Sequence, residues 1–306
     1  MGGCRDSSVS NASSAKYEEN PLHFNLLSLI TPLIFLNEDT FMSIKCGKVE
    51  AYLHEKLKSD GVVHLTLVDP EDLMIEPENL KDVVRNAEKA GTDAFMVGGS
   101  LGIAHSDSFR VIKTIKETTT LPVIIFPGNV DGVLRSADAI FFLSLLNSRN
   151  PYWISGAQAL GAPLIRRMGM EAIPTAYLVV EPGGSVSFIG DAKPIPKDKP
   201  DIAAAYALAG EFLGMRLIFL EAGSGAKVPV PDSMISTVKK AVTVPIVTGG
   251  GIKEADVAAQ KVAAGADIIA TGTLISEAKD LGEKLATVIK AVKEEGKKRL
   301  AKDSGA

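Results

Sequence analysis

The sequence lacks the features that mark several large classes of protein. Its 306 residues contain two cysteines, Cys4 and Cys46, which are too few for a disulfide framework and have no metal-type spacing. The net charge is −4 and the basic residues are scattered, so there is no basic stripe of the kind that binds nucleic acid. No predicted strand ends in lysine and no G-x-G-x-x-G follows a first strand, which argues against a Schiff-base aldolase and a dinucleotide site. These absences favour small-molecule chemistry in the reducing cytoplasm.

An apolar run long enough to span a membrane is also missing. Residues 26–36 are apolar but number only eleven and are interrupted by Pro32, whereas a spanning helix needs roughly 20 residues. Acidic residues precede this run and no small-residue cleavage site follows it, which is unlike a signal peptide. We therefore expect residues 1–44 to be an extension outside the fold, with Met42 as an alternative start, and any membrane contact to be peripheral.

What the sequence does contain is an alternation of short apolar runs with helical stretches. Eight runs rich in Val, Ile and Phe are typical of strands: HLTLVDP (64–70), AFMVGGS (94–100), PVIIFPG (122–128), AIFFLSL (139–145), TAYLVVEPG (175–183), LIFLEAGSG (217–225), PIVTGGG (245–251) and IIATGT (268–273). Continuous apolar strands indicate a parallel sheet buried on both faces.

The count of eight predicts an α/β fold, a (β/α)₈ TIM barrel formed by residues 45–306 as a single catalytic domain. The connection at residues 129–138 has the weakest helical pattern, so we expect one irregular helix after strand 3. A doubly wound open sheet is the alternative architecture.

Glycines follow most of the predicted strands. In a TIM barrel the carboxyl ends of the strands share one face, and that face carries the chemistry. VTGGGI (247–252) and ATGT (270–273) follow the last two strands, where glycines let backbone N–H groups approach an anion. The pattern predicts a phosphate site, and the alternative is that these glycines only turn the chain.

Side chains that carry oxygen atoms stand at the ends of the first two predicted strands. Asp69 ends the first and Ser100 ends the second, its neighbour in a barrel. A carboxylate and a hydroxyl suit Mg²⁺, which takes few protein oxygens and completes its shell with water and substrate phosphate. The alternative is that Asp69 starts a turn before Pro70. A phosphate site and a metal site on opposite walls imply two phosphorylated substrates, or one with phosphates at both ends.

The segment after the fourth predicted strand, residues 141–163, is unusually apolar and aromatic for a catalytic face. Tyr152 and Trp153 stand near the start of its helix, where a barrel helix is normally exposed. A long apolar substrate or a subunit interface would explain them, and the pattern does not separate the two. His64 has no patterned partner and is interpreted as structural.

Seven motifs together resemble the geranylgeranylglyceryl phosphate synthase family. In chain order they are HLTLVDP, MVGGS, LPVIIFPG, LNSRNPYWISGAQ, FLEAGSGA, TGGGI and ATGT, and the likeness covers residues 45–298. NPYWISGAQ is similar to the second of the family's two groups. The resemblance implies a prenyltransferase that joins geranylgeranyl diphosphate to the 3-hydroxyl of sn-glycerol 1-phosphate. This reaction releases diphosphate, uses Mg²⁺ and makes the first ether bond of archaeal membrane lipids. Because the family forms dimers and hexamers, it also implies a homo-oligomer.

The resemblance also implies roles for individual residues. Asp69 and Ser100 match the metal positions, and Glu221 would accept the proton of the attacking hydroxyl as general base. The positions that match the glycerol phosphate site are Phe219, Leu220, Glu221, Ala222, Gly223, Ser224, Gly225, Gly250, Gly251, Gly272 and Thr273. The family commonly has Tyr where Phe219 stands, so one hydroxyl contact to the substrate would be missing. Phe126 and Tyr177 are candidates for the groove that holds the prenyl chain.

Two other functions remain open. A sugar-phosphate isomerase or lyase would use Asp69 and Glu221 as an acid/base pair, would not need Mg²⁺ and would have a polar pocket, which the aromatic segment around Trp153 argues against. A non-catalytic phosphate or lipid binder would keep the glycines but would have no need for Glu221.

Overall fold

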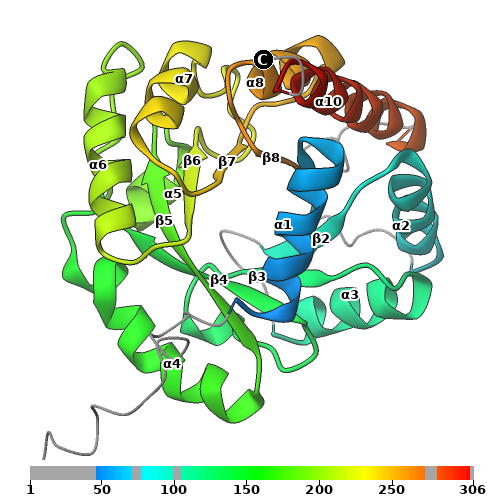
Figure 1. Cartoon of the computed structure of the whole chain (residues 1–306). Helices are drawn as coiled ribbons and strands as arrows, with labels where there is room; N and C mark the ends of the chain where they lie inside the picture. Colours follow the sequence, from blue (N-terminus) through cyan, green and yellow to red (C-terminus); the bar gives the residue numbers. More distant parts are fainter. Residues whose placement is uncertain (1–45, 71–76, 99–104, 273–280, 304–306) are drawn as a thin grey trace, which may run out of the picture. The chain divides into compact units, whose positions relative to one another are not determined.

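Eight parallel strands close into a barrel in which each strand pairs with its neighbours in sequence and β8 pairs with β1 (Figure 1). The computed structural model describes residues 46–70, 77–98, 105–272 and 281–303. Cys46–Ala306 form one compact unit. The predicted TIM barrel is therefore confirmed, while the predicted extension at residues 1–44 lies outside the described residues.

The strands match the predicted runs with one difference. Their bounds are β1 Val63–Val68, β2 Ala94–Gly98, β3 Val123–Phe126, β4 Ala139–Leu145, β5 Glu171–Val179, β6 Leu217–Glu221, β7 Ile246–Gly249 and β8 Ile268–Thr271. The prediction that β5 starts at residue 175 was wrong by four residues. Pro174 weakens the strand signal in the sequence, but β4 pairs with β5 along its whole length, from Ala139 opposite Glu171 to Leu145 opposite Tyr177.

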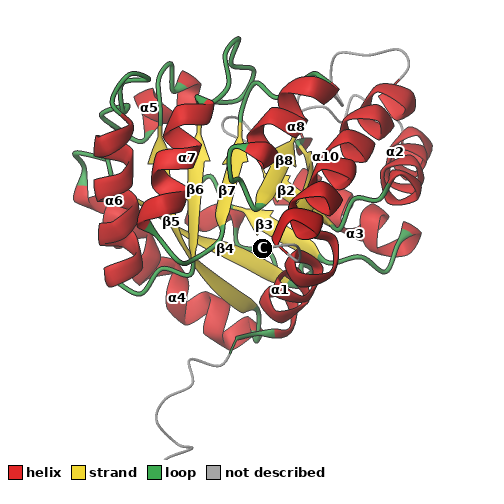
Figure 2. Ribbon diagram, turned by 45° about the horizontal axis from the view of Figure 1, so that its top comes forward, coloured by secondary structure: helices red, strands yellow, loops and turns green. Residues whose placement is uncertain are grey.

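The helices surround the barrel (Figures 1 and 2). Their bounds are α1 Lys48–Asp60, α2 Pro77–Ala90, α3 His105–Thr118, α4 Ala157–Met168, α5 Gly184–Ile189, α6 Pro200–Phe212, α7 Asp232–Ala241, α8 Ala255–Ala263 and α10 Leu281–Asp303. The expected irregular connection after β3 is confirmed, because it holds only the 3₁₀ turn η5, Val130–Gly132. The sequence pattern did not indicate α1, α5 or the π-helix η6, Tyr152–Gly156. No helix in the described ranges is long and apolar enough to cross a membrane.

Side chains of the strands pack into two layers of core. Leu65, Phe141 and Phe219 belong to the cluster inside the barrel, whereas Phe95 and Leu220 belong to the cluster between the sheet and the helices. Successive residues of a strand point to opposite faces, so each strand must be apolar on both. This double burial explains the continuous apolar runs in the sequence.

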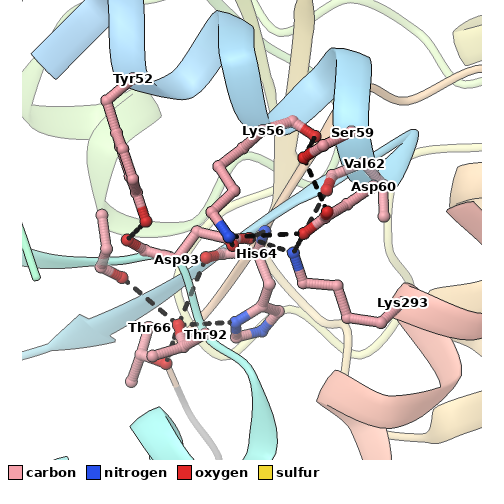
Figure 3. A network of polar contacts seen from close by, with 11 residues as sticks. Tyr52, Lys56, Ser59, Asp60, Val62, His64, Thr66, Thr92, Asp93 and Lys293 are labelled. Carbon is pink, nitrogen blue, oxygen red and sulfur yellow. Dashed lines mark hydrogen bonds and ion pairs between the residues drawn. The ribbon is translucent and has the colours of Figure 1, made fainter.

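A polar network joins β1 and β8 to the residues just before β2 and to helices α1 and α10 (Figure 3). His64 on β1 is fully buried between the hydroxyls of Thr92 and Thr271, each 3.0 Å from a ring nitrogen. Burial lowers the pKa of His64 to about 3, so its ring is neutral. The carboxylate of Asp93 accepts a hydrogen bond from the backbone of His64 and pairs with Lys293 of α10. These contacts confirm the structural interpretation of His64.

Candidate active site

A cavity of about 350 Å³ opens at the carboxyl ends of the strands. One part of its wall, which we call the glycine arm, follows β6, β7 and β8 and consists of Ser224, Gly225, Gly250, Gly251 and Gly272. The other part, which we call the apolar arm, lies by β3, β4 and α4 and consists of Pro127, Val130, Ile140, Phe142, Trp153 and Ile165. The cavity therefore combines a backbone-rich surface with a long apolar one.

Glu221 ends β6 and borders the glycine arm. Its side chain lines the cavity although the residue is only 8% exposed, and its Oε1 accepts a hydrogen bond from the backbone of Gly223 at 2.6 Å. Burial raises the pKa of Glu221 to about 7, against the smaller lowering effect of the Gly223 N–H. Near neutral pH this carboxyl is therefore poised either to accept or to donate a proton.

The glycine arm offers backbone donors that the fold leaves unused. Within the described ranges, the N–H groups of Ser224, Gly225, Gly250 and Gly251 donate no hydrogen bond to another part of the protein. Gly250 has φ +81°, and a Cβ there would lie 2.4 Å from Oε1 of Glu221. Only glycine fits this approach, and the free N–H groups form a concavity of the kind that binds phosphate.

The predicted residues of the β6 segment divide between two faces. Phe219, Glu221, Ser224 and Gly225 line the cavity. Leu220 and Ala222 are fully buried in the outer core, between the sheet and the helices. The side chains of Leu220 and Ala222 therefore support the strand, and only their backbone lies near the site.

Three aromatic rings fill the barrel beneath Glu221. The rings of Phe126, Tyr177 and Phe219 pack together with centroids 5.2 to 5.6 Å apart. Tyr177 lies opposite Phe219 across β5 and β6, is 6% exposed and lines the cavity. Burial and the charge of Glu221 raise the pKa of Tyr177 well above its usual value, so its hydroxyl keeps its proton. The family commonly has a tyrosine at the position of Phe219 on β6. In this chain Tyr177, on the neighbouring strand β5, provides a tyrosine hydroxyl instead.

Side chains hold the π-helix at the wall of the apolar arm. Nε2 of Gln158 donates to the backbone oxygens of Leu143 and Trp153, and the hydroxyl of Ser144 donates to the oxygen of Ile154 at 2.6 Å. Trp153 lines the cavity. Two explanations were left open for Trp153, a long apolar substrate and a subunit interface. Its place in the cavity wall favours contact with a substrate.

Tyr152 has a different position from Trp153. Its hydroxyl donates to Oδ1 of Asn129 at 2.6 Å and so links η6 to the loop after β3. Asn129 lines the cavity beside Val130. Tyr152 therefore connects two parts of the wall without lining the cavity itself.

The predicted metal pair is described only in part. Asp69 follows β1 and lines the cavity, on the wall that also includes Leu67. Ser100 lies outside the described residues, as does Thr273 of the predicted phosphate site. Gly272, the neighbour of Thr273, lines the cavity.

The charges of the cavity have one sign. Asp69 and Glu221 are its charged lining residues, and within the described part of the chain no lysine, arginine or histidine lines it. Among the described residues, a phosphorylated ligand would therefore meet backbone dipoles and two carboxylates but no cationic side chain.

A second group of potential metal ligands lies on α1 and just before it, at the other end of the barrel. Donor atoms of Cys46, Glu50 and His54 lie within 4.8 Å of one another. However, both carboxylate oxygens of Glu50 already accept hydrogen bonds from Arg216, at 2.6 and 2.8 Å. The positive charge of Arg216 opposes binding of a cation there.

Comparison with known sequences gives consistent matches along the barrel. The model of the PcrB family matches residues 54–294. The geranylgeranylglyceryl phosphate synthase of Thermococcus gammatolerans is 54% identical over 235 residues, which cover 77% of this chain and 92% of the relative.

Solved structures give the same result. A geranylgeranylglyceryl phosphate synthase of Thermoplasma acidophilum, crystallised with its substrate sn-glycerol-1-phosphate, aligns with a TM-score of 0.76 and 38% identity over 82% of this chain and all of the relative. The enzyme from Thermoplasma volcanium aligns with a TM-score of 0.74 and 40% identity over 79% of this chain and 96% of the relative. From its sequence matches and its barrel, the chain belongs to the PcrB family, together with the geranylgeranylglyceryl phosphate synthases.

Proposed function

We propose that the chain is a prenyltransferase that joins geranylgeranyl diphosphate to the 3-hydroxyl of sn-glycerol 1-phosphate and releases diphosphate. The observation that carries this proposal is the two-part cavity, in which Glu221 borders a concavity of free N–H groups and shares the site with a long apolar wall. The Thermoplasma acidophilum relative was crystallised with sn-glycerol-1-phosphate. The same acceptor fits the glycine arm here.

The glycine arm binds the phosphate of the acceptor. The N–H groups of Ser224, Gly225, Gly250 and Gly251 are available to donate hydrogen bonds to its oxygens. Tyr177 adds a neutral O–H donor from the neighbouring strand. With the phosphate held there, the hydroxyls of the glycerol lie toward Glu221, which is three residues before Ser224.

The apolar arm binds the prenyl chain. Burial is worth about 0.8 kcal/mol per CH₂, so a C20 chain gains most of its affinity from contacts with side chains such as Phe142, Trp153 and Ile165. The diphosphate end of the donor then lies toward Asp69 and Glu221, the two carboxylates of the cavity.

Glu221 acts as the general base. Its carboxylate accepts the proton of the 3-hydroxyl while that oxygen bonds to C1 of the prenyl group. The bond between C1 and the diphosphate oxygen breaks, and the electron pair leaves with diphosphate. A pKa near 7 lets Glu221 hold the proton after the step. A carboxylate beside a phosphate is useful here because it accepts the hydroxyl proton, while the neighbouring N–H groups hold the anion.

Mg²⁺ fits the charge of the site. Asp69 supplies a carboxylate oxygen, the kind of ligand that Mg²⁺ prefers, in a cavity whose described lining has no cationic side chain to balance a diphosphate. Asp69, together with Ser100 as the sequence predicts, would hold the ion. When bound, Mg²⁺ stabilises the negative charge of the departing diphosphate.

The two rival functions fit the cavity less well. A sugar-phosphate isomerase or lyase has no use for the apolar arm. A non-catalytic binder has no use for a buried carboxyl with a pKa near 7, because that burial costs stability at neutral pH.

The test is product formation by the purified chain with geranylgeranyl diphosphate and sn-glycerol 1-phosphate, with Mg²⁺ and with EDTA. We expect an ether product with Mg²⁺, none with EDTA, and little product with sn-glycerol 3-phosphate. Tyr177→Phe should weaken acceptor binding by about tenfold, as loss of a hydrogen bond to a charged group does. Absence of product under every condition would overturn the proposal, and equal activity with EDTA would overturn the role of Mg²⁺.

A further inference from the structure

Helix α5 lines the cavity with three of its residues and carries one phenylalanine that does not line it. Val186 and Ile189 belong to the cavity wall, whereas Phe188 between them is 91% exposed. Helix α5 follows β5, at the end of the barrel where the strands finish. A single exposed apolar side chain is ordinary on a protein surface, so its surroundings decide what it means.

Hydrogen bonds fix α5 at both ends. The N–H of Gly183 donates to the oxygen of Ala222 at 3.0 Å, and the hydroxyl of Ser148 donates to the oxygen of Gly190 at 2.5 Å. These contacts tie the helix to the loops after β6 and β4. Phe188 is therefore held outward on a well-anchored helix.

Four lysines on this face of the barrel, in the segments that follow β5 and β6, have no acidic partner among the described residues. They are Lys193, Lys197 and Lys199 in the segment after α5, and Lys227 on the loop after β6. In the described ranges none of these four lysines forms an ion pair or donates a side-chain hydrogen bond. Asp198 lies among them, and the nearby Asp191 is paired with Arg149. Val228, which follows Lys227, is 48% exposed.

We propose that this edge of the cavity rests on an anionic lipid bilayer while the enzyme takes up its prenyl diphosphate. We call it the docking edge and define it as Phe188, Ile189, Lys193, Lys199, Lys227 and Val228. Apolar side chains that enter the boundary of the bilayer, flanked by lysines that meet anionic headgroups, are the usual composition of a peripheral membrane contact.

The inference rests on the proposed function, because the proposed donor is itself a lipid. A C20 chain partitions into a bilayer and leaves its diphosphate at the surface. Since α5 forms part of the cavity wall, contact of the docking edge with the bilayer brings the cavity to the lipid surface. The prenyl chain then enters the apolar arm with little exposure to water.

The experiment is flotation of the full chain with vesicles, without substrate. One set of vesicles contains phosphatidylcholine and phosphatidylglycerol in equal parts, and the other contains phosphatidylcholine alone. We expect binding to the anionic vesicles, and we expect Phe188→Ser to weaken it about tenfold. The combined change Lys193→Gln, Lys199→Gln and Lys227→Gln should weaken it by at least about tenfold on anionic vesicles only.

The opposite end of the barrel provides matched controls. Phe212 ends α6, before β6 begins, and is 80% exposed. Lys58 is an exposed lysine of α1. Phe212→Ser and Lys58→Gln should leave vesicle binding unchanged. Equal losses in these controls, or no binding by the unmodified chain, would overturn the proposal. A change of oligomeric state in Phe188→Ser, with vesicle binding intact, would assign the edge to a contact between copies instead.

Activity measurements separate this inference from the proposed function. With geranylgeranyl diphosphate supplied in anionic vesicles, Phe188→Ser should lower kcat/KM about tenfold. With the same substrate dispersed in detergent, its activity should equal that of the unmodified chain. A chain that is active in detergent but indifferent to vesicles would overturn only the docking edge. A chain that binds vesicles but forms no product would overturn only the prenyltransferase.

Discussion

The two ends of the barrel treat buried carboxylates in opposite ways. Where the strands begin, the buried carboxylates have cationic partners, as in the pairs of Glu50 with Arg216 and Asp93 with Lys293. Asp267 likewise pairs with lysine and arginine side chains. Where the strands end, Glu221 is also buried but has only a backbone N–H as its partner within the described residues.

The difference in partners suggests that the carboxylates at one end stabilise the fold and that Glu221 at the other end takes part in the reaction. A paired carboxylate stays ionised and fixes the elements that it joins, and removing one partner leaves an unbalanced charge. An unpaired buried carboxyl has a raised pKa, which weakens the fold at neutral pH but makes the group a useful base. Burial also raises the pKa of Asp93, but the charge and hydrogen bond of Lys293 oppose that rise. Glu221 has only the N–H of Gly223 to oppose it among the described residues.

The sharpest way to test the contrast is to neutralise Glu221. Glu221→Gln keeps the shape of the side chain but cannot accept the hydroxyl proton, so kcat should fall by about 10²–10⁴-fold. Glu181→Gln is the matched control, because Glu181 is an exposed glutamate on the same face and should keep full activity. Steady-state kinetics measure both. Unchanged kcat in Glu221→Gln would remove the general base from the mechanism.

The opposite end should respond in stability instead. Asp93→Ala removes the acceptor of the His64 N–H and the more buried of the two carboxylates that pair with Lys293, while Asp60 remains. The free energy of unfolding should therefore fall by roughly 3 kcal/mol. Denaturant titration measures the loss. The surface pair of Lys81 with Glu78 is the control, and Glu78→Ala should leave unfolding unchanged. A small loss in Asp93→Ala would mean that this network does not stabilise the barrel.

A third test measures how stability changes with pH. A carboxyl usually stabilises the fold more as pH rises, whereas Glu221 should stabilise it less. Its pKa is about 7 in the folded chain and 4.5 in the reference state, so the folded chain binds more protons between these values. The stability of the unmodified chain should therefore fall as pH rises through this interval. Relative to Glu221→Gln, it should be equal below pH 4.5 and lower by up to roughly 3 kcal/mol above pH 7.

Thermal unfolding of both proteins across this pH range measures the effect. The acid limb of kcat/KM should show the same pKa near 7, since the base must be deprotonated. If Glu221→Gln is no more stable than the unmodified chain at pH 8, burial of the ionised carboxylate does not destabilise the fold.

The smallest effect separates backbone strain from crowding of the site. Gly250 and Gly169 both have positive φ, but a Cβ at Gly250 would collide with Glu221, whereas a Cβ at Gly169 would meet nothing within 4 Å. Gly169→Ala should cost about 1–2 kcal/mol of stability from its positive φ alone. Gly250→Ala should cost more, because its Cβ would also lie 2.7 Å from the backbone oxygen of Gly223. Only Gly250→Ala should also raise KM for sn-glycerol 1-phosphate. Equal kinetics in the two variants would place the phosphate elsewhere.

Much of this molecule could be predicted from local sequence pattern. The eight strands were visible because each is apolar on both faces, and the glycines after β6, β7 and β8 marked the face that carries the site. Helix α5 was missed because it is short and begins with glycine. Helix α1 has a weak apolar stripe, and hydrogen bonds from its first turn to Glu171 help hold it in place.

The sequence by itself determined the barrel, the end of it that carries chemistry, and the position of Glu221 at the end of a strand, since these follow from periodicity and from which residue comes next. Only the tertiary structure decided that Tyr177 lies across from Phe219 and that Trp153 faces the cavity. It also decided that Glu221 has, among the described residues, no cationic partner like that of Asp93. The physical reason is that closure of the barrel brings side chains from distant strands together, and burial and partners, which set the pKa of a carboxyl, depend on that convergence.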